Sequence, residues 1–200
     1  LSSMVMVPTL MACMVTTVMV HWFFGMETVL TFPKMPFLPL ELLPHLIGLG
    51  LFSGFLGVAF DKGSLGIGKF YRLPIFKKDW MKIAFPLLLT IPLTYLLPQV
   101  LGAGDGVIEA MIDLKGTLTM VLIVLLGKFL FTILSTGSGA PGGSLQPMLV
   151  LGSLCGALYG NVMVQLGLLP EAYRLNMVML GMAGWFAGSV RAPVTAILLL

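Results

Sequence analysis

Charged side chains are scarce in this sequence. The 11 Lys and Arg and the 8 Asp and Glu residues make up 10% of 200 positions, against about a quarter in average globular proteins. A water-soluble surface needs roughly 25–35% of these residues, so the composition excludes an ordinary soluble domain, a disordered segment and a free-standing nucleic-acid-binding module. With 58% hydrophobic residues and a mean hydropathy of +1.05, the chain is predicted to be an all-α, polytopic membrane protein.

Metal-binding and catalytic residues are equally sparse. Cys13 and Cys155 are the two cysteines, and both lie in apolar stretches, where we expect small buried hydrophobic side chains and not a metal site. His21 and His45 flank the first loop, and we expect them at the membrane interface. The length leaves no room for a soluble catalytic domain, so no enzymatic activity, metal or cofactor is predicted.

The apolar runs predict six to eight helices in a single transmembrane domain, residues 1–200. Spans are expected over 1–26, 42–60, 83–101, 117–135 and 145–169, with a shorter helix over 175–190 and a last one starting at Arg191. The strongly basic segment 61–82 is predicted to be a cytoplasmic loop by the positive-inside rule. Both ends fall inside apolar runs and no basic signal-peptide region opens the chain, so we expect a piece of a longer membrane protein.

Several of these runs are interrupted by Gly and Pro at membrane depth, which predicts tilted and broken helices around a polar path. The sharpest interruption is residues 136–147, within a stretch that has no charged residue from Phe129 to Pro170. Glycine there permits close approach to the main chain. The helix that restarts near Ser144 presents free amides and the positive end of its dipole. Such a site suits a small anion, which neutral donors hold without trapping.

Plainer interpretations remain open at each of these positions. Residues 136–147 also fit a simple Gly-Pro loop between two helices. A nucleotide site is a further interpretation of a glycine-rich loop, but the missing Gly-Lys-Ser/Thr ending argues against it. Lys128, inside an apolar run, either raises the potential near an anion path or pairs with a carbonyl. Asp105, Glu109 and Asp113 are expected to be solvated or to cap a helix, and Arg191 to be structural.

The sequence Gly137-Ser138-Gly139-Ala140-Pro141-Gly142-Gly143-Ser144-Leu145-Gln146-Pro147-Met148 resembles the second-half selectivity-filter segment of the CLC family of chloride channels and chloride/proton antiporters. That family has Gly-x-Phe-x-Pro where this chain has Gly143-Ser144-Leu145-Gln146-Pro147, so Leu145 stands in place of Phe. Residues 97–104 are similar to the family's Gly-rich approach to a short helix. Residues 181–184 and 189–195 are similar to its late helices.

The resemblance implies most of the second half of a CLC-type pore, in an inverted-repeat fold that forms homodimers with one pore per subunit. It implies that the amides of Ser144 and Leu145 hold the central chloride and that the Gln146 amide faces the outer anion position. Gly143 and Pro147 complete the predicted anion site. The supporting loop is predicted to comprise Gly137, Ser138, Gly139, Pro141 and Gly142.

Function is therefore expected to be transport of chloride or another small anion across the cell (plasma) membrane, with the lipid bilayer and the missing first-half helices as partners. Channel and proton-coupled antiporter stay open, because no acidic residue here matches the family's gating or proton-transfer glutamates. The alternatives are a fluoride-selective relative, prompted by Leu145, and a non-conducting membrane scaffold.

Overall fold

The computed structural model describes residues 3–25, 36–76, 78–102, 104–112, 117–140 and 142–190. Within these stretches the chain forms α-helices and short 3-10 turns, with no strand, which confirms the all-α prediction. Four helices of the described residues are long and apolar enough to cross a membrane. The chain divides into two units, residues 1–31 and 32–200.

The first unit contains α1, Ser3–Phe24, which includes the apolar stretch Val7–Phe24. No charged residue interrupts α1, and the helix continues through Pro8 in its second turn. The side chains from Val7 onward are exposed within this unit. Cys13 is among them, so the expectation that both cysteines are buried is wrong for Cys13 and confirmed for Cys155.

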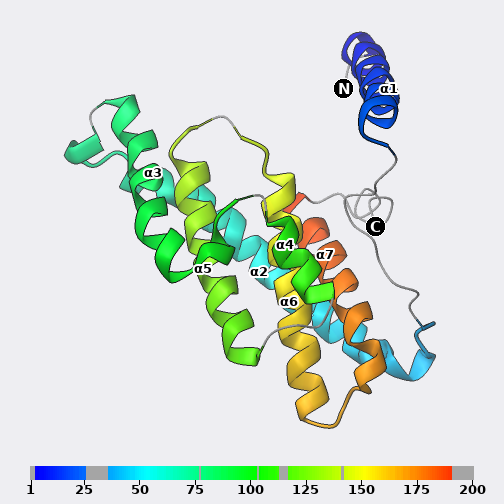
Figure 1. Ribbon diagram of the computed structural model, residues 1–200. Coiled ribbons are helices and arrows are strands. Elements are labelled where there is room, and N and C mark those ends of the chain that lie inside the picture. Colours follow the sequence, from blue (N-terminus) through cyan, green and yellow to red (C-terminus); the bar gives the residue numbers. More distant parts are fainter. Residues whose placement is uncertain are drawn as a thin grey trace. The chain divides into compact units, whose positions relative to one another are not determined.

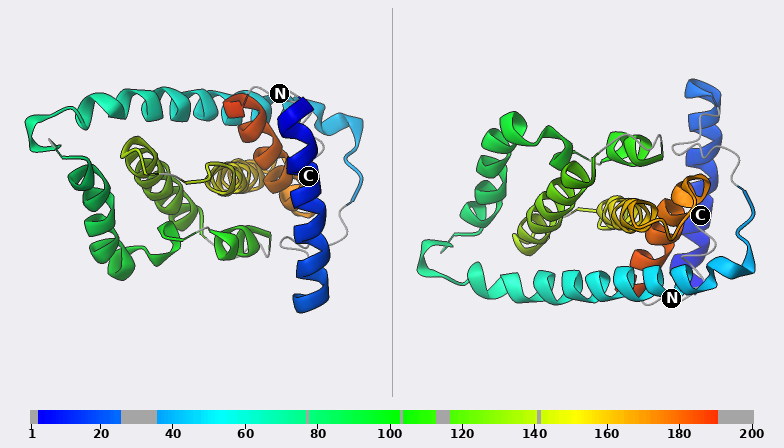
Figure 2. Two further views of the ribbon diagram at one scale, coloured as in Figure 1. Left: turned by 90° about the horizontal axis from the view of Figure 1, so that it is seen from above. Right: turned by 90° about the horizontal axis from the view of Figure 1, so that it is seen from below.

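The second unit is a bundle of tilted helices (Figures 1 and 2). Its helices are α2 (Leu43–Phe70), α3 (Asp79–Leu96), α4 (Asp105–Ile112), α5 (Leu118–Gly137), α6 (Leu145–Gln165) and α7 (Arg174–Val190). The 3-10 turns are η1 (Leu40–Leu42), η2 (Pro74–Phe76), η3 (Pro98–Val100) and η4 (Glu171–Tyr173). Helix α6 packs against α7, α5 and the short α4, while α2 lies along α7 and α5. Helix α6 thus contacts elements from across the unit, while residues 142–145 at its start are exposed.

Close backbone approach fixes α6 against α7. A Cβ atom on Gly152 would lie 2.6 Å from the Cα of Met182, and one on Gly181 would lie 2.6 Å from the Cα of Gly156. Small residues spaced by four along α6 thus let the two backbones touch, as membrane helices often do. Beside this contact, the fully buried Trp185 packs edge-on against Phe129 and tilted against Phe60, with ring centroids 6.2 Å away in both pairs.

The segment 61–82 departs from its prediction as a cytoplasmic loop. Helix α2 continues to Phe70, and the charged residue Asp61 is held within it by the Ser189 hydroxyl, which donates to the carboxylate at 2.9 Å. The Asp61 carboxylate thus has a hydrogen-bond partner on α7 in place of the water that would hydrate it in an exposed loop. The connection to α3 is confined to residues 71–78.

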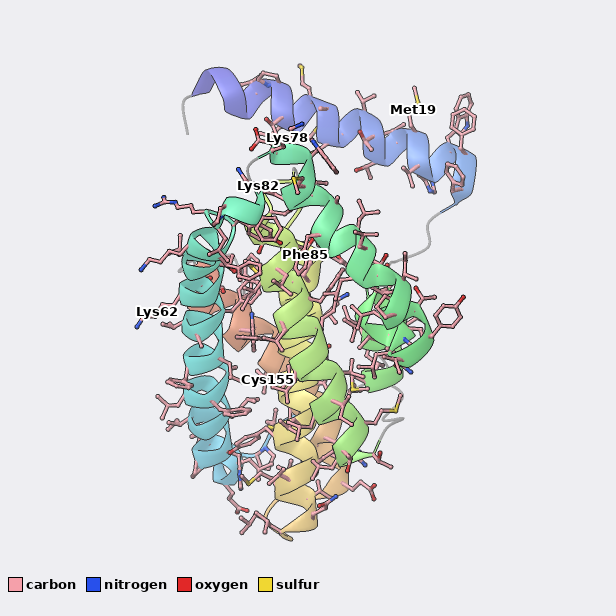
Figure 3. The ribbon with its side chains drawn as sticks, turned by 90° about the vertical axis from the view of Figure 1, so that its left-hand side faces the viewer. Met19, Lys62, Lys78, Lys82, Phe85 and Cys155 are labelled. Carbon is pink, nitrogen blue, oxygen red and sulfur yellow. The ribbon has the colours of Figure 1, made fainter. Side chains whose placement is uncertain are left out.

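Aromatic side chains close the junction between α2 and α3. Tyr71 and Phe76 are buried and pack with Phe70 and Phe85, the last of which is marked in Figure 3. The Tyr71 hydroxyl donates to the Leu134 carbonyl on α5 at 2.8 Å, and burial raises the pKa of Tyr71.

Cations surround this junction. Lys62 on α2 is exposed, and Lys78 and Lys82 lie at the start of α3 (Figure 3). The Lys82 ammonium, 2.7 Å from Asp79, keeps the pKa of that carboxyl below its ordinary value by a hydrogen bond and by its charge. The same end of the unit thus combines buried aromatics with solvated positive charge.

Candidate functional site

The interruption between α5 and α6 is where the sequence places it. Helix α5 ends at Gly137, and Ser138 caps it: its hydroxyl donates to the Ser135 carbonyl at 2.7 Å and accepts from the Ala140 amide at 3.3 Å. Gly139 follows with φ of +79°, a left-handed conformation that favours glycine. These local bonds end the helix and turn the chain toward α6.

The first turn of α6 carries amides without intrahelical partners. Helix α6 begins at Leu145 with Ser144 as its N-cap, and the Ser144 side chain makes no capping hydrogen bond. The first intrahelical bond runs from the Met148 amide to the Ser144 carbonyl at 3.2 Å. Pro147 has no N–H, and among the described residues no acceptor bonds the amides of Ser144, Leu145 and Gln146, which are the remaining donors of this helix end.

A cavity of about 420 Å³ lies beside this helix end. It is lined by Gly102, Lys128, Phe131, Thr132, Ser135, Thr136, Ala140, Gly142, Gly143, Ser144 and Pro147. Three parts of the chain meet there: the Gly-rich corner before α4, the C-terminal half of α5, and the loop leading into α6. The lining combines hydroxyl groups and main chain with a single basic side chain.

The predicted site residues divide between the cavity wall and its surroundings. Gly142, Gly143, Ser144 and Pro147 line the cavity. Leu145 is 44% exposed at the helix start, Gln146 is half-buried beside it, and neither belongs to the cavity lining.

Of the predicted supporting loop, Gly142 lines the cavity, whereas Gly137, Ser138 and Gly139 do not. Gly137 ends α5 against Ile67 of α2, and Ser138 and Gly139 form the turn behind the lining. Pro141 lies outside the described residues, as do Asp113 and Arg191.

Lys128 is the basic residue of the cavity. It is 2% exposed, and its ammonium donates to the Val100 carbonyl at 3.0 Å and to the Gly102 carbonyl at 2.8 Å. A buried charge is tolerated when hydrogen bonds replace its water. The two sequence interpretations of Lys128 are thus compatible, since it pairs with carbonyls and also faces the cavity at the α6 N-terminus.

Asp105 makes a contact that the sequence did not predict. It begins α4, yet its carboxylate also accepts a hydrogen bond from the Gln146 side-chain amide, 41 residues away. The expectation of a merely solvated or capping residue is therefore incomplete for Asp105. Glu109, one turn farther along α4, is exposed as expected. The Gly-x-Gly-Asp order of residues 102–105 indicates a helix break followed by an acidic residue, but it does not identify Gln146 as the hydrogen-bond partner of Asp105.

Comparison with known proteins shows the family of the chain. A family model described as voltage gated chloride channel matches residues 1–200. The chain is 31% identical to the H(+)/Cl(-) exchange transporter ClcA of Vibrio campbellii over 188 residues, which cover 88% of this chain and 38% of that protein. It is also 31% identical to the putative chloride channel protein ClcB-like of Ralstonia nicotianae over 199 residues, covering 96% of this chain and 45% of the relative.

The chain thus spans less than half the length of these curated relatives. Its match to the family is nonetheless continuous from the first residue to the last. The chain, with its apolar helices, is an integral membrane protein that belongs to the voltage-gated chloride channel (CLC) family.

Proposed function

We propose that this chain forms part of a pore that passes small anions, chloride foremost, across a membrane. The observation that carries the proposal is the start of α6. Its unpaired amides adjoin a cavity of about 420 Å³ whose wall also holds the buried Lys128. The relatives' names, an H(+)/Cl(-) exchange transporter and a putative chloride channel, support transport and not catalysis, and both modes of transport agree with the site.

Neutral donors suit an ion that must also leave. In this proposal the amides of Ser144 and Leu145 hold a central anion and the Gln146 amide an outer one, and the α6 dipole adds favourable potential. Gly143, without a side chain, leaves the approach to these amides open. Lys128 is already bonded to two carbonyls, so it attracts the anion from a distance and does not form a contact ion pair. That arrangement gives binding that is weak enough for conduction.

The remaining parts of the pore come from outside the chain in this proposal. First-half helices of the same protein complete the anion ligands, and two subunits assemble as a homodimer in the cell membrane. The basic residues of the α2–α3 connection, including Arg72 and Lys78, face the cytoplasm by the positive-inside rule. No cofactor or nucleic acid takes part.

A backbone-directed substitution tests the site. Leu145→Pro removes one proposed donor at N1, the helix position where proline is best tolerated, and Leu145→Ala shortens the same side chain but keeps the amide. In proteoliposomes holding the native protein that contains this sequence, chloride flux should fall roughly tenfold or more for the Pro variant, the loss expected for a hydrogen bond to a charged group. The Ala variant should retain most of the flux. Equal flux in both variants would contradict the assignment.

A fluoride-selective transporter is the second candidate, favoured by Leu145 at a filter position where the family has Phe. The comparison is chloride against fluoride flux in the same proteoliposomes, before and after Leu145→Phe. A native preference for fluoride that shifts toward chloride in the variant supports this candidate. A native preference for chloride excludes it.

A further inference from the structure

The Gly-rich corner consists of η3, the residues that follow it and the first residue of α4, that is residues 98–102, 104 and 105. It is bonded to α5 and packed against α6, the two helices that flank the cavity. Lys128 on α5 holds it through the carbonyls of Val100 and Gly102. On the α6 side it lies in direct contact, because a Cβ on Gly104 would be 2.6 Å from the Val150 side chain. Gly104 has φ of +95°, so the corner depends on glycine there for its shape as well.

The corner ends in Asp105, whose carboxylate accepts from the side-chain amide of Gln146. Gln146 is the second residue of α6, and its main-chain amide is one of the unpaired donors at that helix end. A hydrogen bond to an ionised acceptor is stronger than one between neutral groups. The Gln146 side chain thus bonds the first turn of α6 to the Gly-rich corner, which also accepts hydrogen bonds from Lys128.

Asp105 also brings a negative charge to the region that attracts anions. The groups that face it are Gln146 from α6 and Lys128 from α5, with which its carboxylate interacts electrostatically, and Glu109 one turn along its own helix. Glu109 is exposed and therefore screened by solvent. Asp105 and Lys128 thus carry opposite charges close to the start of α6.

We propose that Asp105 is a positioning and specificity-determining residue of the anion site, acting through Gln146. This inference rests on the function proposed above and adds two separable roles to it. As an acceptor, Asp105 fixes the Gln146 side chain and with it the orientation of the first turn of α6, which decides which anions fit. As a charge, it weakens anion binding and so favours release.

Two substitutions of Asp105 separate these roles. Asp105→Asn keeps an acceptor for Gln146 but removes the charge, so chloride should bind about tenfold more tightly, as expected for loss of a unit charge roughly 10 Å away at an effective dielectric constant of about 20. The nitrate-to-chloride permeability ratio should stay at the native value. Asp105→Ala removes both charge and acceptor, so the ratio should change as well. Glu109→Gln, which neutralises an exposed carboxylate on the same helix, is the matched control and should alter neither quantity.

An exchange of donor and acceptor tests the contact itself. Gln146→Glu alone sets two carboxylates against each other and should disturb the permeability ratio. Combined with Asp105→Asn, the hydrogen bond can re-form with its polarity reversed, and the native ratio should return. Failure of the double variant to recover while it remains folded would overturn the positioning role. Unchanged chloride affinity in Asp105→Asn would overturn the charge role.

The measurements use the native protein that contains this sequence, with calorimetric titration of chloride and anion flux in proteoliposomes. Thermal unfolding of Asp105→Ala, Gln146→Ala and their combination in detergent forms a double-mutant cycle that does not depend on transport. If the native protein neither binds nor passes chloride, the proposed function fails and the specificity role falls with it, even where the cycle shows coupling. If chloride passes but the cycle is additive and the ratios are unchanged, the Asp105 proposal alone fails.

Discussion

Removing the charge of Lys128 isolates its effect on the anion site. Lys128→Met replaces the ammonium by an uncharged chain of similar length, at a position that is 2% exposed and lines the cavity beside Ser144. The substitution removes the basic side chain of the cavity and leaves the α6 amides in place. Chloride affinity should fall, because the remaining donors are neutral.

The expected size follows from the geometry. A unit charge across a cavity of about 420 Å³ acts over on the order of 8 Å, which at an effective dielectric constant of about 20 is worth about 2 kcal/mol, or roughly 30-fold in chloride affinity. A separate cost falls on the fold. The buried Val100 carbonyl loses its donor, which costs about 1–3 kcal/mol of unfolding free energy, whereas water can bond to the carbonyl of the exposed Gly102.

Calorimetric titration of chloride against the purified native protein measures the affinity, and thermal unfolding measures the stability. Lys62→Met is the matched control, because Lys62 is exposed on α2 and points outward (Figure 3); it should change neither quantity by much. Lys128→Arg keeps the charge and should retain affinity within a few-fold, even where stability falls. A folded Lys128→Met protein that binds chloride as tightly as the native protein would refute the electrostatic role.

Three further predictions concern the fold and the chain as a whole. Tyr71→Phe should lower the unfolding free energy by about 1 kcal/mol, because the Leu134 carbonyl loses its donor. Burial raises the pKa of Tyr71, so its contribution is complete below its ordinary pKa of about 10 and is lost as pH rises through the folded value; thermal melts between neutral and alkaline pH should show this loss in the native protein and not in the variant. Gly156→Ala should destabilise by about 1–3 kcal/mol, since its Cβ would lie 2.7 Å from the Cα of Val178, whereas Gly66→Ala, with open space, should be neutral or stabilising in the same melts. The 200-residue chain alone should give little selective anion flux in proteoliposomes, and robust flux would contradict the need for further helices.

The helix boundaries were predictable where the chain carries its own signals. The breaks near Gly102 and Gly139 coincide with positive φ values that glycine alone adopts easily. The end of α2 was not predictable in this way, because Asp61 remains helical with a hydroxyl partner from α7. Helix α3 likewise continues through Pro86 and Pro92. In α2 the local sequence favoured an end, and the contact with α7 overrode it.

The candidate site shows the same division. Glycine, the missing charge and the free amides of a helix start are all local properties, so residues 142–147 could be singled out from the sequence. Asp105 could not, because its hydrogen bond to Gln146 joins residues 41 positions apart through the packing of α4 on α6. Lys128 was ambiguous for a related reason: its carbonyl partners lie in another element, and only the fold reveals that the same side chain also faces the cavity.

The shortage of charge that excludes a soluble protein also suits the proposed mechanism. A lysine in direct contact with an anion in a low-dielectric site would bind it strongly and slow its release. Here the Lys128 ammonium is occupied by two carbonyls, and Asp105 offsets part of its potential. In the proposed mechanism the anion would meet main-chain amides as its immediate ligands, and fixed charges would act on it only from a distance. In this arrangement affinity can be adjusted by Lys128 and Asp105 without altering the ligands themselves, so a CLC protein with few charges can combine selectivity with release.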